Sequence, residues 1–97
     1  MKMMLIIYSE AADQIILSAL KNAGVKAYTK TQEAYGEGSE TEPKLGTHYW
    51  PGRNNILFIA TDKDEIDVII QTLSILKKEH PKAGIRSFIL PVEEQIL

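Results

Sequence analysis

The chain contains no cysteine among its 97 residues, which excludes a disulfide framework, thiolate metal sites and redox chemistry at sulfur. A large excess of charge of one sign is also lacking. The formal net charge is −2, so no general attraction to nucleic acid is expected. No apolar run approaches the roughly 20 residues of a membrane-spanning helix, so we expect no membrane insertion. The first residues offer no small-residue cleavage site, and we therefore expect a cytoplasmic protein.

Two short apolar runs, Met4–Tyr8 and Ile56–Ala60, are the most informative features that the chain does contain. Each is too continuous for a strand with one solvated face, so both predict central strands that are buried on both sides. A chain of 97 residues has enough helix to cover only one side of a small sheet. We therefore expect a second copy of the chain to cover the other side, so that the protein oligomerises through its sheet.

Hydrophobic spacing predicts the remaining elements. A helical pattern begins at Ser9 and stops near Gly24, and Asp62 followed by Glu65 resembles a capping box at the start of a second helix. A polar, glycine-rich and proline-rich stretch over 35–53 is longer than most connections, and such loops are often functional. The expected elements are strands over 2–8, 25–31, 54–61 and 85–91, with helices over 9–23 and 62–79 and a tail over 92–97.

The order strand, helix, strand, strand, helix, strand predicts an α+β fold of the ferredoxin-like βαββαβ type, as one domain over 1–97. Right-handed crossovers would place both helices on one face of a four-stranded antiparallel sheet. The first and third strands then lie in the middle, with 25–31 at an edge. These central positions are the ones that the two apolar runs require.

Glycines mark two candidate sites for a small anionic ligand. Gly36 and Gly38 follow the second expected strand, and Gly84 lies between Lys82 and Arg86. Backbone N–H groups at such positions form anion-binding nests, although turn geometry alone also explains each glycine. A dinucleotide fingerprint and a P-loop are both excluded, since no third glycine opens a helix and no Gly-Lys-Ser/Thr is present.

Aromatic residues in the long loop suggest a contact with a partner. Tyr49 and Trp50, with Arg53 close behind, lie in a segment that is otherwise polar. An aromatic pair beside Pro-Gly is typical of a protein contact or a stacking surface. A small hydrophobic cap under the loop is the alternative interpretation.

The chain contains few candidate catalytic or metal-binding groups. His48 and His80 have no neighbouring serine or aspartate in a triad pattern, so we expect no enzyme. At the end of the second helix, His80 is suited to a capping role. His48 with Glu37 and Glu40 offers a divalent-metal site as an alternative, although the spacing matches no established ligand motif.

Three segments together resemble the PII-like (GlnB-like) signalling family: Tyr35–Gly38, Tyr49–Asn55 and Gly84–Val92. The resemblance covers essentially the whole chain and lies in element order and glycine placement. It implies a homotrimer whose loop over 35–53 touches a partner protein. It also implies that a small effector, usually an adenine nucleotide, binds between subunits. The residues it assigns to that ligand are Gly36, Gly38, Lys82, Gly84 and Arg86.

These observations lead to one hypothesis and two alternatives. The leading hypothesis is a non-enzymatic, trimeric regulator that binds a small anionic ligand and acts through its long loop. The first alternative is a divalent-metal-binding protein similar to the trimeric CutA proteins, which share the architecture. The second alternative is an oligomeric interaction module without a ligand.

Overall fold

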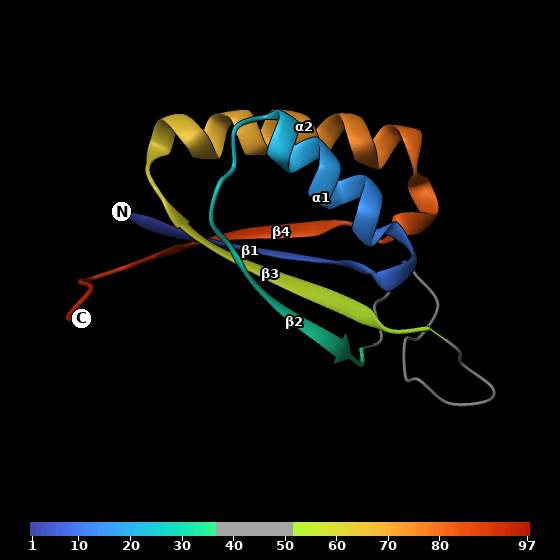
Figure 1. Ribbon diagram of the computed structural model, residues 1–97, viewed down its shortest axis with the longest axis horizontal. Helices are drawn as coiled ribbons and strands as arrows, with labels where there is room; N and C mark the ends of the chain where they lie inside the picture. Colours follow the sequence, from blue (N-terminus) through green and yellow to red (C-terminus); the bar gives the residue numbers. More distant parts are fainter. Residues whose placement is uncertain (37–51) are drawn as a thin grey trace.

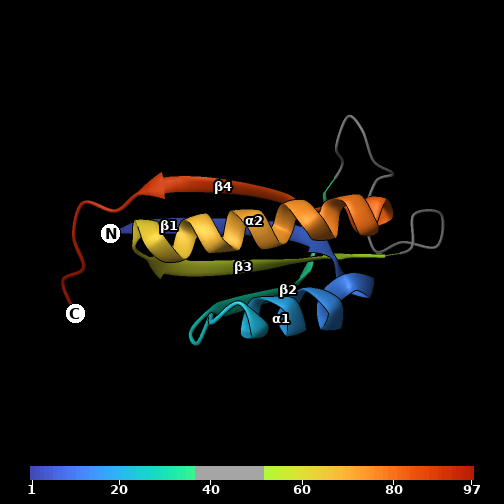
Figure 2. The same ribbon diagram turned by 90° about the horizontal axis from the view of Figure 1, so that it is seen from above.

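A computed structural model describes residues 1–36 and 52–97. Its elements are β1 (Lys2–Ser9), the 3₁₀ turn η1 (Glu10–Ala12), α1 (Asp13–Asn22), β2 (Thr29–Ala34), β3 (Asn54–Thr61), α2 (Lys63–Glu79), the 3₁₀ turn η2 (Pro81–Ala83) and β4 (Arg86–Pro91). The strands form a four-stranded antiparallel sheet in the order β2-β3-β1-β4. Both helices lie over the same face of this sheet (Figures 1 and 2). The ferredoxin-like α+β fold is therefore confirmed, with the two apolar runs at its centre.

The hydrophobic core lies between the helices and the sheet. In β1 and β3 every second side chain faces this layer, as strand geometry requires. The strands contribute Met4, Ile6, Tyr8, Leu57 and Ile59, all at most 1% exposed. The helices contribute Ile16, Leu20, Ile66, Ile69, Leu73 and Leu76.

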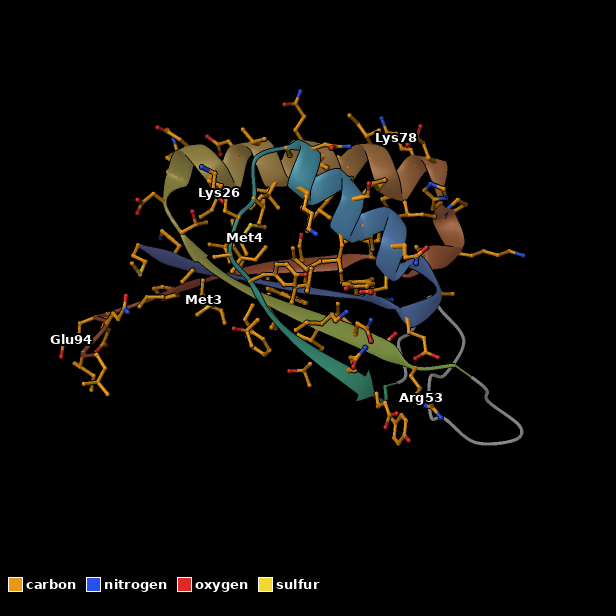
Figure 3. The ribbon with its side chains drawn as sticks, viewed as in Figure 1. Met3, Met4, Lys26, Arg53, Lys78 and Glu94 are labelled. Atoms are coloured by element: carbon orange, nitrogen blue, oxygen red, sulfur yellow. The ribbon has the colours of Figure 1, made fainter. Side chains whose placement is uncertain are left out.

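The opposite face of the sheet is apolar and has no covering layer among the described residues. Figure 3 shows Met3 and Met4 pointing to opposite sides of β1, with Met4 toward the helices. We call this second side the open face; its apolar side chains are Met3, Leu5, Ile7, Ile56, Phe58, Phe88 and Leu90, placed together by the strand register. Phe88 and Leu90 are 49% and 46% exposed. In a single chain, then, the central strands are buried on one side only.

Three local predictions differ from the structure. The second strand begins at Thr29 and not at 25, and the Val25 N–H donates to the Leu20 carbonyl of α1 at 3.0 Å instead of to a neighbouring strand. The first helix begins with η1 before it becomes α-helical. The capping box is wrong, since Asp62 makes no side-chain cap and Glu65 instead accepts a 2.9 Å hydrogen bond from the Thr61 hydroxyl.

The structure confirms the positions of two residues that were predicted to lie at helix ends. Gly24 ends α1 with a positive φ of 99°, a conformation that favours glycine. His80 is the C-cap residue of α2, and its backbone N–H donates to the Leu76 carbonyl at 2.8 Å. The capping role of its imidazole stays a prediction. Across 1–36 and 52–97, no helix has both the length and the apolar character needed to cross a membrane.

Candidate functional site

Strand ends bring the two glycine segments to one end of the sheet. Ser9, the last residue of β1, pairs with Asn54, the first of β3, which also pairs with Ala34 at the end of β2. Arg86 begins β4 beside Ile7. We call this the loop end of the sheet, and it lies on the right in Figure 1. Segments near Gly36 and Gly84, 48 positions apart in sequence, thus share one end of the molecule.

Backbone irregularity marks the base of the long loop. The β2–β3 register shifts between Thr31 and Ala34, and Glu33 within this bulge has a φ of 58°. Left-handed backbone at a residue with a Cβ costs about 1–2 kcal/mol. Strain of this kind is commonly found at functional sites.

Arg53 lies at the other end of the long loop, just before β3. Its carbonyl accepts a 2.8 Å hydrogen bond from the Glu10 N–H, which attaches this segment to η1. Its guanidinium approaches Glu33 at 3.8 Å, too far for a hydrogen bond. Its Nε is buried and finds no acceptor in the part of the chain that the structure describes. A buried donor without an acceptor is rare in folded proteins and requires an explanation.

An apolar hollow of about 390 Å³ lies between the first turn of the α1 region and η2. This volume falls within the range of roughly 300–1,000 Å³ that is usual for small-ligand sites. Its lining residues are Ser9, Ala11, Ala12, Ile15, His80, Pro81, Lys82 and Ala83. Lys82 alone among these described residues carries a fixed charge, so the hollow combines a mainly apolar lining with one positive charge.

A second hollow, of about 420 Å³, lies between α2 and β4. Lys77 and Arg86 supply its positive charge, and Ser74 and Ser87 supply hydroxyl groups. Gly84, in left-handed conformation with φ 66° and ψ 32°, forms the turn between the two hollows. Lys82 lines the first of these hollows and Arg86 lines the second, so neither of these two hollows of the described residues contains both cations.

Asp13 is the centre of a polar network that sequence reasoning missed. Its carboxylate accepts hydrogen bonds from Tyr8 Oη at 2.6 Å, from Lys30 Nζ at 3.0 Å and from Asn55 Nδ2 at 3.0 Å. These donors come from β1, β2 and β3, so the first residue of α1 is attached to three strands. The network fixes the strands that lead to the loop end. A polar Asn55 at the head of an apolar strand was the signal for it.

The network also shifts two pKa values. Burial raises the pKa of Tyr8 well above its usual value, and the hydrogen bond to Asp13 and the charge of Asp13 add to this effect. Burial alone would raise the pKa of Asp13. Hydrogen bonds from Tyr8, Lys30 and Asn55, with the charge of Lys30, outweigh burial and hold the pKa below its ordinary value.

Several predicted site residues lie outside the described residues. These are Gly38, Tyr49 and Trp50, and the alternative metal ligands Glu37, Glu40 and His48. Within 1–36 and 52–97, no three histidine, aspartate or glutamate side chains converge as a metal site requires. The metal alternative therefore stays a prediction.

One comparison with known proteins identifies a family for this chain. The family model described as "Nitrogen regulatory protein P-II" matches residues 1–97. No curated protein sequence matches. Among solved structures, CPII of Thiomonas intermedia K12 bound to ADP and bicarbonate superposes with a TM-score of 0.73 at 19% identity, over 91% of this chain and 81% of that one.

Two further structures show the same fold. The apo form of CPII gives a TM-score of 0.64 at 19% identity, over 94% of this chain and 89% of that one. A protein of Thermus thermophilus, described as a putative PII-like signaling protein, gives 0.60 at 24% identity, over 91% and 82%. Because the family model spans every residue, the chain belongs to the P-II family of nitrogen regulatory proteins.

Proposed function

We propose that this chain is a trimeric, non-enzymatic signalling protein that binds an adenine nucleotide between subunits and signals through its loop over 35–53. The observation that carries this proposal is the gathering of Gly36, Arg53, Gly84 and Arg86 at the loop end of the sheet in a P-II family chain. CPII, which has the same fold, was solved with ADP, AMP and bicarbonate. These ligands of CPII support an adenine nucleotide and a small anion as the proposed ligands of this chain.

The open face supports the oligomer. Its apolar side chains on three strands remain partly exposed in a single chain, and a patch of this kind usually marks an interface. Trimer formation through this face would bury the second side of β1 and β3. It would also bring the loop end of one subunit against that of the next.

Assembly also explains why Lys82 and Arg86 line separate hollows. A nucleotide held between subunits can meet Lys82 of one chain and Arg86 of its neighbour, so the cations need not converge within one chain. The apolar hollow beside Lys82 would receive the base, and the nest around Gly84 would receive phosphate oxygens. Gly36 and Gly38 would close the site from the base of the long loop.

Signalling would follow from population shift, since a ligand favours the loop state that it binds better. Arg53 is suited to sense the small anion, because its Nε is buried without an acceptor among the described residues. Tyr49 and Trp50 would then contact the partner protein.

Thermal unfolding with added ligand tests the proposal. ADP at a hundred times its dissociation constant should stabilise the native state by about 2.7 kcal/mol. In a chain of this length, such a gain raises Tm by roughly 10 °C or more. The panel comprises ADP, AMP, ATP, bicarbonate, phosphate and zinc chloride.

Two double variants make the test specific. Lys82→Ala/Arg86→Ala should lose most of the shift with ADP. Lys21→Ala/Lys26→Ala removes the same charge from exposed sites near the opposite end of the molecule, where Figure 3 shows Lys26, and should keep the shift. Equal shifts in both variants would refute the site, and no shift with any nucleotide would refute the function.

A further inference from the structure

The outward face of α2 carries an unusual pattern of side chains. Asp64, Val68, Gln71, Ile75 and Lys78 follow one another at alternating spacings of four and three residues, and all five are exposed. This spacing places them in one stripe along the helix, as in the seam of a coiled coil. We call these five residues the α2 seam.

The α2 seam points away from the molecule's own core. Ile66, Ile69, Leu73 and Leu76 are the buried residues of α2 and occupy the opposite side of the helix. Figure 3 shows Lys78 on the side of α2 that faces away from the sheet. Val68 is 42% exposed and Ile75 is 54% exposed, so the centre of the seam presents branched apolar side chains to solvent.

The polar groups beside the seam are already satisfied within the helix. Thr72 Oγ1 donates to the Val68 carbonyl at 2.9 Å, and Ser74 Oγ donates to the Ile70 carbonyl at 2.8 Å. Covering this face would therefore leave neither hydroxyl without a partner.

Charge along α2 selects the orientation of a partner helix. The first turn is acidic, with Asp64 and Glu65, and the last turn is basic, with Lys77 and Lys78. The helix dipole alone favours such ends, but it does not explain exposed Val68 and Ile75 between them. Two copies of α2 placed antiparallel would bring each acidic end against a basic end, whereas a parallel pair would oppose like charges.

The register of that pairing follows from the sequence. With a two-fold axis at Gln71, Asp64 lies seven positions before the axis and Lys78 seven positions after it. Val68 lies three positions before the axis and Ile75 four positions after it, so Val68 of one copy meets Ile75 of the other. The two Gln71 amides can then hydrogen-bond to each other. The seam is thus complementary to itself, as an isologous contact requires.

We infer that α2 is a self-association surface, through which two copies of this chain pair their helices antiparallel about Gln71. The open face lies on the other side of the molecule, so this contact can join one assembly to another. A seam roughly 22 Å long and about 10 Å wide is well below a stable interface. The association is therefore reversible and depends on concentration.

The absence of cysteine allows a direct test by disulfide trapping. Gln71→Cys places one thiol at the axis and should form a linked dimer under mild oxidation about ten times faster than a control. Lys63→Cys is that control, since it is exposed on the same helix but about 100° round from Asp64. Equal rates for the two variants would overturn the inference.

Mixed variants test the orientation. Asp64→Cys and Lys78→Cys should each link slowly with themselves and rapidly when mixed, because only the antiparallel pair brings these positions together. Rapid self-linking of Asp64→Cys would contradict the arrangement. In sedimentation velocity, Ile75→Glu should abolish the rise of sedimentation coefficient with concentration without lowering Tm, and an unchanged rise would also overturn it.

Discussion

Replacing Asp13 with alanine should lower the free energy of unfolding by about 3 kcal/mol. The side chains of Tyr8 and Asn55, 0% and 2% exposed, would each lose the acceptor for a buried donor. A buried polar group left without a partner costs about 1–3 kcal/mol. Lys30, whose side chain is 23% exposed, can turn to water, so its loss adds little.

Urea unfolding at matched protein concentration measures this loss. With an m value of roughly 1.5 kcal/mol/M, the midpoint should fall by about 2 M. Asp13→Asn keeps an acceptor for Tyr8 and should lose less than the alanine variant. Asp67→Ala, an exposed aspartate on α2, should change stability by no more than about 0.5 kcal/mol. A loss below about 1 kcal/mol for Asp13→Ala would refute the claim that the network stabilises the fold.

Four further predictions concern pH, assembly and backbone strain. The pKa of Asp13 is lowered, so its contribution to the free energy of unfolding is complete above about pH 4 and should fade as pH drops through the folded-state pKa. The urea midpoints of the native protein and of Asp13→Ala should converge in that acid range. The pKa of Tyr8 is raised, so stability should fall above about pH 10, where only the unfolded state readily loses the proton, and Tyr8→Phe should remove this loss. Leu5→Asp, at the middle of the open face between Phe58 and Phe88, should reduce the mass in light scattering to that of one chain. Gly84→Ala meets no atom within 4 Å but keeps a φ of 66°, so it should cost about 1 kcal/mol and lower Tm by roughly 4–8 °C.

The arrangement of the sheet could be predicted from the sequence because the two apolar runs indicate which strands are buried. Continuous hydrophobicity in Met4–Tyr8 and Ile56–Ala60 required central positions, and β1 and β3 occupy them. Helical spacing likewise predicted α2, which ends at Glu79 as expected. Alternation over 25–31 was a weaker guide, since strand pairing begins only at Thr29 and the Val25 N–H bonds to α1.

The polar parts of the site depend on register, which the sequence leaves open. Tyr8 and Asn55 are cross-strand partners 47 positions apart, and only their pairing makes Asp13 a shared acceptor. In the same way, Lys82 and Arg86 are four residues apart but face different hollows, because a left-handed Gly84 separates η2 from β4. Their spacing in the sequence does not by itself place the two cations in one hollow.

Calorimetric titration of ADP into the native oligomer and into the Leu5→Asp monomer tests the central claim most directly. Because the proposed nucleotide site lies between subunits, the oligomer should bind ADP saturably and the folded monomer should bind at least about tenfold more weakly. Equal affinity in both would contradict a site between subunits, and no binding to the oligomer would contradict the nucleotide-sensing function itself.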